Sequence, residues 1–390
     1  MLVLLVIVII VLLAMAQFYL KSKAMTSFAT TMAAIFGSVL AFSYYEPLSG
    51  FLIARGQGGQ WAQAGIFIVL FIFSFGLLRV LADVIWDPDT DFGAIATKVS
   101  AVVCGLATGL IISGVVVVAL AMTPSAAKWP YPRFGDGQTA ISDVRSAKRP
   151  PIGADGMVCG LFSWMSKGSL SSSRSFAVYH AGFLDQLHLN GYKAKGGVSR
   201  IAGKDAITVP RKGLRRLDGD NDNLTAVRME VRRGSIKQGG AGEAKDGVSF
   251  MLGQVRLVCK KQGADNTRGA GEAIYPEGRL VPRRSDPEGK GKALTGVMSG
   301  SVMMPGTLDE VVTFTNDDFT RSGRAALDLA FQIPSGMQPV LLEFKDNVVV
   351  SVGGVEPASE ETEAALREGG ASTDGGGDSS RPQRPRDPNS

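Results

Sequence analysis

Arg79 and Asp83 are the ionisable residues whose position most directly suggests chemistry, because they lie inside a strongly apolar segment. Their spacing of four residues places both side chains on one side of a helix. An ionisable pair inside a membrane span is a candidate proton or ion relay. Long charged side chains near the end of a span can instead reach the interface or pair with each other. We interpret Arg79 and Asp83 as such an interfacial pair and keep the relay as the alternative.

The other groups that could do catalysis do not form a catalytic set. The only two histidines, His180 and His188, are eight residues apart, whereas a helical metal-binding pair uses a spacing of four. The serine-rich stretch 166–175 contains no GxSxG nucleophile motif. Catalysis by a nucleophile needs a base and a group that orients the base. The sequence supplies none at useful spacing, so we expect a non-enzymatic protein without a cofactor.

Metal binding is not expected either. Three aspartates alternate over 218–222 like the start of a calcium loop, but Asn223 and Met229 stand where that loop requires glycine and a bidentate glutamate. We therefore interpret this stretch as a polar turn. Cys159 and Cys259 could form one disulfide in an oxidising compartment. The interpretation that we favour is that both are buried thiols.

Four apolar segments before residue 123 predict an integral membrane protein. A bilayer core about 30 Å thick needs roughly 20 apolar helical residues. We predict spans over 1–20, 25–45, 62–85 and 100–122. A cleaved signal peptide is the alternative for the first segment, because residues 14–16 have the small-x-small form of a cleavage site.

The positive-inside rule gives an orientation for these spans. Lys21, Lys23 and Lys98 favour a cytoplasmic location for the connections after the first and third spans. The N-terminus and residues 123–390 would then both be extracytoplasmic. Aromatic residues support this threading, since they prefer the two membrane interfaces. They form one predicted belt of Tyr44, Tyr45, Trp61, Trp129 and Tyr131 and a second of Phe18, Tyr19 and Trp86.

Two of the predicted spans carry ridges of small residues at every fourth position. Small side chains let helix backbones approach closely, which favours packing in lipid, either within one chain or between copies in a homo-oligomer. The predicted helix-packing residues are Ala29, Ala33, Gly37 and Ala41 in the second span and Ala101, Gly105, Gly109 and Ser113 in the fourth.

Several of these membrane features together resemble a known family. They are the break at 45–48, the Phe-rich segment 67–78 running into 79–83, and the 91–93 lead into a glycine-rich span. Residues 1–125 are similar in this way to the colicin V production protein (CvpA) family. The resemblance implies a bacterial inner-membrane protein associated with toxin production or export and with envelope maintenance. About two thirds of the chain lies outside it.

The region after the spans is basic and predicted to be β-rich. Residues 123–355 hold 32 basic against 23 acidic side chains. We predict a linker and short mixed segment over 126–196 and a β-rich domain over 197–355, because short β-branched runs alternate there with turn residues. The segment 327–352 resembles a hairpin of an Ig-like sandwich, with a turn at 334–336. Residues 260–271 and 277–292 are interpreted as loops, and 356–390 as a disordered tail.

The basic groups of this domain suggest an anionic partner. Without interleaved aromatic residues they do not predict a nucleic-acid surface, so lipid headgroups or anionic envelope polymers are the candidate partners, and a merely solvated surface is the alternative. These residues are Arg211, Lys212, Arg215, Arg216, Arg228, Arg232 and Arg233. The sequence thus predicts a four-helix membrane domain that anchors a β-rich domain, with a transporter or channel subunit as the alternative function.

Overall fold

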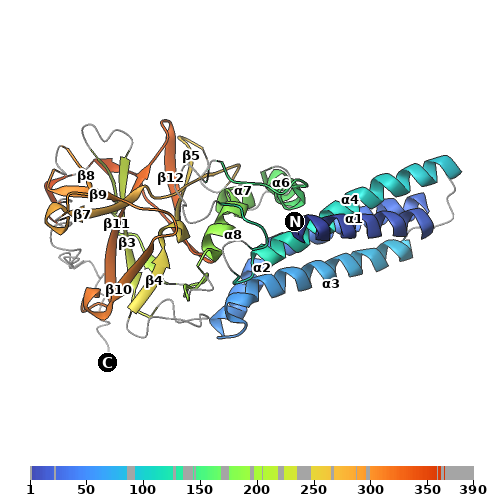
Figure 1. The fold of residues 1–390 in the computed structure, drawn as a ribbon, viewed down its shortest axis with the longest axis horizontal. Coiled ribbons are helices and arrows are strands. Elements are labelled where there is room, and N and C mark those ends of the chain that lie inside the picture. Colours follow the sequence, from blue (N-terminus) through green and yellow to red (C-terminus); the bar gives the residue numbers. More distant parts are fainter. Residues whose placement is uncertain are drawn as a thin grey trace, which may run out of the picture.

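The computed structural model of the chain has a helical bundle at one end and a β-rich domain at the other (Figure 1). The residues that the structure describes are 2–21, 23–85, 93–125, 129–134, 144, 146–167, 175–193, 197–203, 205–217, 224–234, 247–264, 268–286, 288–295, 299–357, 359–361 and 364. Most of the predicted disordered tail, the 218–222 aspartates and Trp86 lie outside these residues.

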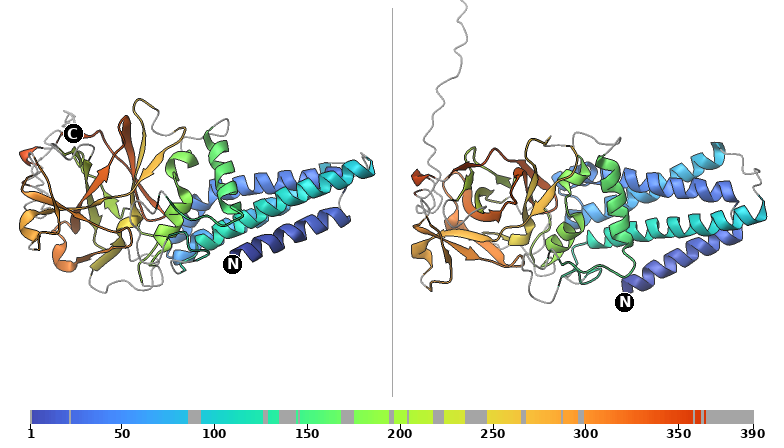
Figure 2. Two further views of the ribbon diagram at one scale, coloured as in Figure 1. Left: turned by 45° about the horizontal axis from the view of Figure 1, so that its top comes forward. Right: turned by 90° about the horizontal axis from the view of Figure 1, so that it is seen from above.

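Four helices in the bundle are long and apolar enough to cross a membrane. They are α1 (Leu2–Lys21), α2 (Ala24–Ala54), α3 (Ala62–Ile85) and α4 (Ala94–Ala121). The N-terminus lies at the end of the bundle that carries the β-rich domain (Figures 1 and 2). The chain therefore enters and leaves the bundle at the same end, as an even number of spans requires.

Helix α2 is longer than its predicted span, and the predicted break at 45–48 is wrong. The helix continues through Pro47 to Ala54. Proline removes one backbone hydrogen bond from a helix interior, but this last part of α2 is held by tertiary packing. Tyr45, Ser49 and Ile53 are all buried there. The C-terminal part of α2 thus belongs to the contact with the rest of the chain.

Three helices after the bundle cover its end, so the segment predicted as a linker is largely packed. They are α6 (Ala154–Lys167), α7 (Phe176–Tyr179) and α8 (Phe183–Gly191). Phe162, Phe176 and Phe183 share one buried cluster with Phe42 of α2 and Phe67 of α3. Ring centroids of Phe42 lie 5.0 Å from those of Phe162 and 5.4 Å from those of Phe176. An aromatic core therefore joins α6–α8 to the membrane helices.

The β-rich domain is built from strands of three sheets. One sheet has the order β14-β2-β3-β11-β7-β9-β8 with β1 on β3, a second pairs β10 with β4, and a third has the order β13-β12-β5-β6. The main core cluster draws buried side chains from all three, among them Val227, Phe250, Leu257 and Leu342. The bounds are β1 Ile207–Thr208, β2 Leu214–Arg216, β3 Leu224–Arg232, β4 Gly247–Met251, β5 Val255–Lys261, β6 Glu272–Ile274, β7 Gly278–Pro282, β8 Lys292–Ala293, β9 Ser301–Pro305, β10 Val311–Thr315, β11 Arg324–Gln332, β12 Met337–Phe344, β13 Val348–Ser351 and β14 Glu356–Pro357.

Two predictions within this domain are wrong. Strands β11 and β12, on either side of the turn at 334–336, do not form a hairpin, because β11 pairs with β3 and β7 whereas β12 pairs with β5 and β13. The turn passes the chain from one sheet to another. The stretch 277–292 is not only a loop, since it contains β7, which lies between β11 and β9. Local turn residues mark where a strand ends but not which strand becomes its partner. The likeness to an Ig-like sandwich stays a prediction.

The predicted aromatic belt at the β-domain end is only partly exposed. Tyr44 and Trp61 are exposed, but Tyr45 and Tyr131 are buried. Tyr45 packs against Phe67 and His180, and Tyr131 packs against His188. The covering helices enclose these rings, so they pack against protein and not against lipid.

Candidate functional site at the junction of the two parts

Arg200 forms the most extensively bonded contact between the membrane helices and the β-rich domain. Its side chain is 1% exposed and its Nε lies 2.9 Å from Oδ2 of Asp346, in the turn between β12 and β13. Its Nη1 donates to the carbonyl oxygens of Ala121 and Thr123, each at 2.7 Å. A guanidinium at a helix C-terminus satisfies carbonyls that have no partner within the helix and favours the negative end of the helix dipole. Arg200 therefore ties the end of α4 to the sheet domain.

Asp346 receives further donors from the helices around it. The amide of Asn190 in α8 donates to Oδ1 of Asp346, and Nε2 of Gln63 in α3 donates to its backbone carbonyl at 3.4 Å. The neighbouring Lys345 is also buried and donates from Nζ to the carbonyl of Ser199 at 2.6 Å. A buried charge is tolerated only when it is paired and hydrogen-bonded. The Asp346 carboxylate meets that requirement only while α8 and Arg200 stay in place.

A second buried ion pair lies on neighbouring strands of the third sheet. Arg256 of β5 and Glu343 of β12 face each other in the register, with 2.5 Å between Nε and Oε2, and both side chains are at most 3% exposed. The guanidinium also donates to the carbonyl of Ala181 at 2.5 Å and to Oε1 of Gln186 at 2.6 Å. Arg256 thus connects the sheet to the chain between α7 and α8.

His180 links this second pair to a membrane helix. Its Nε2 lies 3.0 Å from Oε1 of Glu46 in α2, and its Nδ1 lies 3.3 Å from Oε1 of Gln186. Because both ring nitrogens face oxygen acceptors, the geometry fits a doubly protonated imidazolium. A continuous polar chain therefore runs from Glu46 through His180, Gln186 and Arg256 to Glu343.

The two histidines of the junction have opposite electrostatic surroundings. Burial disfavours the charged form of His180, but the carboxylates of Glu46 and Glu343 outweigh it, so the pKa of His180 is raised above its ordinary value. Burial lowers the pKa of His188 to about 3, with Arg133 and Arg200 adding to the effect. His188 is therefore neutral near pH 7, while His180 is the histidine that can change charge.

A third polar cluster lies between the segment after α4 and the covering helices. The hydroxyl of Tyr131 donates to Oδ2 of Asp155 in α6 at 2.5 Å, and Nε of Arg133 donates to Oδ1 of Asp185 in α8 at 2.6 Å. Burial and the Asp155 carboxylate raise the pKa of Tyr131, so its hydroxyl stays protonated and remains a donor. This segment is therefore more than the tether expected from its composition.

The structure places the predicted small-residue ridges at helix–helix contacts within the chain. A Cβ added at Gly105 or Gly109 of α4 would lie 2.9 Å from the Cα of Met15 and 2.7 Å from the Cα of Val11 in α1, respectively. A Cβ at Gly37 of α2 would lie 3.1 Å from the backbone of Phe75 in α3. The ridge members Ala29, Ala33, Ala41, Ala101 and Ser113 are buried too. The two glycines of α4 pack α1, and Gly37 packs α3.

The other predicted site residues lie away from the junction or remain unpaired. Arg79 pairs with Asp83 in the C-terminal part of α3, and their side chains are 26% and 57% exposed. Cys159 and Cys259 are both buried free thiols, and they belong to different core clusters. The disulfide considered for them is therefore not formed. Burial raises the pKa of Cys259 to about 12, with Glu272 adding to the shift.

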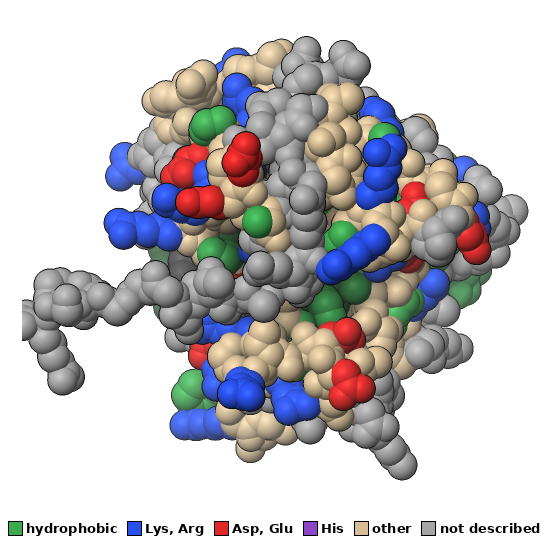
Figure 3. Space-filling view, turned by 90° about the vertical axis from the view of Figure 1, so that its left-hand side faces the viewer, with side chains coloured by type: hydrophobic (Ala, Val, Ile, Leu, Met, Phe, Trp, Pro, Cys, Tyr) green, Lys and Arg blue, Asp and Glu red, His purple; other side chains and the backbone are tan. Residues whose placement is uncertain are grey.

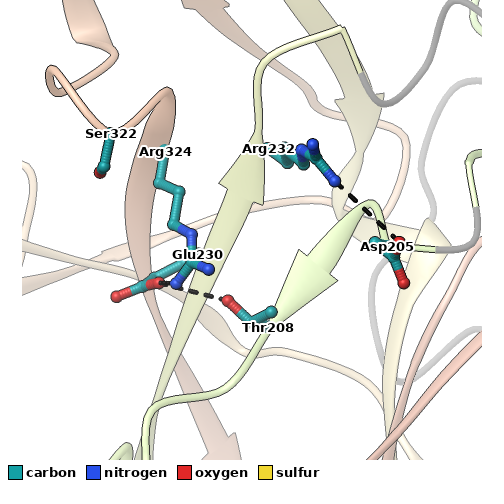
Figure 4. A pocket seen from close by; sticks show the side chains of 6 residues that line it. All are labelled: Asp205, Thr208, Glu230, Arg232, Ser322 and Arg324. Atoms are coloured by element: carbon teal, nitrogen blue, oxygen red, sulfur yellow. Dashed lines mark hydrogen bonds and ion pairs between the residues drawn. The ribbon is translucent and has the colours of Figure 1, made fainter.

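On the end of the β-rich domain, the Lys and Arg side chains that the structure describes are not gathered into one patch. Lys and Arg are spread over this face with Asp and Glu among them (Figure 3). Arg228 pairs with Asp328 at 2.8 Å. A pocket of about 300 Å³ between β1, β3 and β11 contains two further arginines, but Arg324 pairs with Glu230 at 2.9 Å and Arg232 with Asp205 at 4.0 Å (Figure 4). The pocket is also lined by Thr208 and Ser322 and has no net charge to select an anion.

Sequence reasoning missed the junction residues, although the sequence carried a signal for some of them. Arg256 and Glu343 each interrupt an apolar run, and a charged residue inside such a run indicates either an edge position or a buried partner. Glu46 lies 134 residues from His180, so its role as a partner could not be found from spacing. Among the described residues, no group of three or more His, Cys, Asp or Glu side chains could hold a metal ion.

Comparisons with known proteins assign no family to this arrangement. No family model, no curated protein and no solved structure matches the chain. The resemblance to the CvpA family stays a prediction, and the inference about function depends on the junction and the four candidate spans.

Proposed function

We propose that the chain is a non-enzymatic integral membrane protein whose four-helix domain holds the β-rich domain in one fixed orientation at the membrane surface. The observation that carries this proposal is Arg200, which binds the C-terminal carbonyls of α4 and the Asp346 carboxylate with one buried side chain. A fully buried ion pair restricts the relative motion of the two parts more than an exposed ion pair does, because separation would leave buried charges without partners. The function supported is positioning, not catalysis.

The biological setting of this function comes from the resemblance to CvpA proteins. We infer a bacterial-type inner membrane, an extracytoplasmic β-rich domain and a role in envelope maintenance or toxin export. Exposed basic residues such as Arg211 and Lys212 would then face anionic headgroups or envelope polymers. The junction supports this setting only in that it fixes one face of the β-rich domain toward the bilayer.

Substitution of Arg200 tests the proposal. R200Q removes the charge that holds Asp346 and should expose the α4–β-domain contact, measured as faster hydrogen exchange in the β12–β13 turn of the full-length protein in vesicles. R324Q is the matched control, because Arg324 is an arginine of the same domain whose side chain is 51% exposed in its pair with Glu230. In cells that lack the native chain, R324Q should restore envelope integrity and R200Q should not. The proposal would be contradicted by an R200Q variant in which the β-rich domain has separated from α4 and which still restores envelope integrity.

A transporter or channel subunit is the second candidate, and the helix register favours it more than the sequence did. Gly37 of α2 contacts the backbone of Phe75 of α3. Because the two helices run antiparallel, Arg79 lies level with Ala33, one turn further from the β-rich domain. Thr31 of α2 bonds Thr108 of α4 at 2.9 Å, which places that level near the middle of the bundle and not at its end. An ionisable pair at this depth is costly in lipid and is typical of ion pathways.

Substitution of Arg79 separates the two candidates. R79L should leave the positioning function intact if the pair only anchors α3, and it should abolish function if the pair belongs to a polar path. Two quantities are measured: the envelope integrity of cells that lack the native chain and carry the variant, and proton or ion flux into vesicles that contain the purified protein. L78A on the preceding residue of α3 controls for a general effect of substitution at this depth.

A further inference from the structure

Helix α1 fixes the level of the bilayer on the protein. It contains 20 residues, and a helix of that length spans about 30 Å, which equals the thickness of the hydrocarbon core. The charged residues Lys21 and Lys23 mark the edge at its C-terminal end, and about 20 helical residues back from them the other edge lies near Leu2. Leu2 marks the edge on the side of the β-rich domain, and its side chain is exposed, as are those of Leu5 and Ile9.

The packing of α1 on α4 transfers this level to α4. Gly109 packs on Val11 and Gly105 packs on Met15, so the two helices run antiparallel. Five residues further toward the β-rich domain, Gly114 of α4 is therefore level with Val6 of α1. This position lies about 6 Å, or one helical turn, inside the edge that Leu2 marks.

Helix α6 packs on the bundle at this level. A Cβ at Gly114 would collide with the carbonyl oxygen of Ala154 and would lie 2.6 Å from Cγ2 of Val158, so the first turns of α6 rest directly on the backbone of α4. Ala154 also belongs to the cluster that holds Val3 and Ile7 of α1. Near the other end of α6, Phe162 stacks on Phe42 of α2. The Thr31–Thr108 bond places Phe42 level with Ala119, close to the edge.

Helix α6 thus lies across the bundle at the boundary of the bilayer, and both views in Figure 2 show it crossing the long helices. Its inner face carries the buried residues Ala154, Val158, Cys159 and Phe162. Its outer face carries Met157, Gly160, Leu161 and Trp164, and its one charge is Lys167 in the last turn. Met157 is 40% and Trp164 is 71% exposed. The inner face is buried against the bundle, and its one charge, Asp155, accepts a hydrogen bond from Tyr131. The outer face, apolar up to its last turn, needs an apolar environment of its own.

We propose that α6 is an in-plane membrane helix whose outer face, formed by Met157, Leu161 and Trp164, contacts lipid at the headgroup–acyl boundary. The bilayer is the occupant because this face continues the lipid-exposed surface of α1 at the level where α1 ends. Tryptophan prefers this boundary, since its ring is apolar and its N–H is a donor. Lys167, exposed in the last turn, can extend its amine to the headgroups.

Tryptophan fluorescence in vesicles tests the depth of α6. Two single-tryptophan variants keep either Trp164 or Trp61 and carry phenylalanine at the other three tryptophan positions. Trp61 is similarly exposed, at 60%, but the α2–α3 register places it level with Phe51, nine residues beyond Phe42 and so about 13 Å outside the edge.

The variants are reconstituted in dioleoylphosphatidylcholine vesicles with or without brominated acyl chains. Bromine quenches indole on close contact, so the Trp164 emission should fall about twofold or more while the Trp61 emission stays nearly unchanged. Equal quenching of the two tryptophans, or no quenching of Trp164, would overturn the proposal.

Photocrosslinking provides a second measurement that leaves all four tryptophans in place. The photoreactive residue p-benzoylphenylalanine is introduced in the full chain at Met157 or, as a control of equal exposure, at Val349 of β13, which is 42% exposed. After irradiation in the same vesicles, lipid adducts detected by mass spectrometry should form at position 157 and not at 349. The absence of adducts at 157 in a folded protein would overturn the assignment of α6 to the bilayer.

Discussion

At the scale of single residues, the junction depends on buried charges that pair with one another and with hydrogen-bonding groups of the packed helices. Arg200, Asp346, Arg256 and Glu343 all have side chains at most 3% exposed. Replacing such a pair with apolar residues can be nearly neutral, whereas removing one partner leaves an uncompensated charge. These residues therefore specify how the two parts fit together more than they add net stability.

We expect Glu343→Gln to destabilise the third sheet strongly, because it leaves the buried guanidinium of Arg256 without its counter-charge. Loss of one partner of a buried pair costs about 3–5 kcal/mol. The measurement is the opening free energy of β12 amides from hydrogen exchange. R256M/E343L should cost less than E343Q alone, and R324M, which breaks an exposed pair with Glu230, should cost about 0–1 kcal/mol. Equal costs for E343Q and R324M would contradict this account.

The contact between His180 and Glu46 should depend on pH. The pKa of His180 is raised in the folded protein, so the folded state binds this proton more tightly than the unfolded state does. The stabilising contribution is therefore fully present below the ordinary pKa of about 6.5 and is lost as the pH rises through the raised folded value.

This pH dependence can be measured as hydrogen exchange in α7 and α8 of the full-length protein, corrected for the intrinsic rate at each pH. Between about pH 6 and pH 9, protection should fall in the wild type and stay flat in H180Q. A parallel fall in both proteins would assign the effect to another group.

At the scale of elements, the α1–α4 contact depends on the absence of side chains at two positions. Helices associate in lipid through close van der Waals contact of their backbones. Gly105 and Gly109 supply that contact, and Gly37 supplies the corresponding one between α2 and α3. The ridges recognised in the sequence are thus used within the chain.

We expect Gly109→Leu to separate α1 from α4, because its side chain would overlap the Cα of Val11. Overpacking of this kind costs about 1–3 kcal/mol or more. The measurement is the thermal midpoint in detergent. G76L on α3 is the matched control, since a Cβ at Gly76 meets nothing within 4 Å, and it should leave the midpoint unchanged. A loss with G76L and none with G109L would show that the glycine contacts are not used as described.

At the scale of the whole molecule, the bundle and the β-rich domain form one elongated body with the N-terminus at the junction (Figure 1). The connection between α1 and α2 lies at the opposite end of the bundle (Figure 2). If the four candidate spans cross the bilayer, Lys23 and Val349 must lie on opposite sides of it.

Labelling of single cysteines tests this topology. In a background with Cys104, Cys159 and Cys259 replaced by alanine, K23C and V349C are treated with a membrane-impermeant maleimide. In intact cells or spheroplasts V349C should react and K23C should not, and K23C should react only after the membrane is opened. Reaction of both positions from one side would contradict a four-span topology.

The sequence by itself determined the features that depend on local composition and periodicity. Ala62–Ile85 is one continuous helix over the predicted range and is apolar enough to cross a membrane, and runs such as Leu224–Arg232 and Val311–Thr315 are strands, because apolar length and β-branched runs act within a few residues. The glycine ridges were visible for the same reason. The candidate site was not, since His180 and Glu46 meet only after both have been placed by separate elements.

Only the tertiary structure decided which helices and strands of the chain contact one another. It continued α2 through Pro47, passed the chain from β11 to β12 between sheets, and placed α6 on Gly114 of α4. Each of these features depends on contacts between residues distant in sequence, whose free energy outweighs the local signal. A turn, a proline or a short apolar run has several possible partners when it is read alone, and the packed fold selects one.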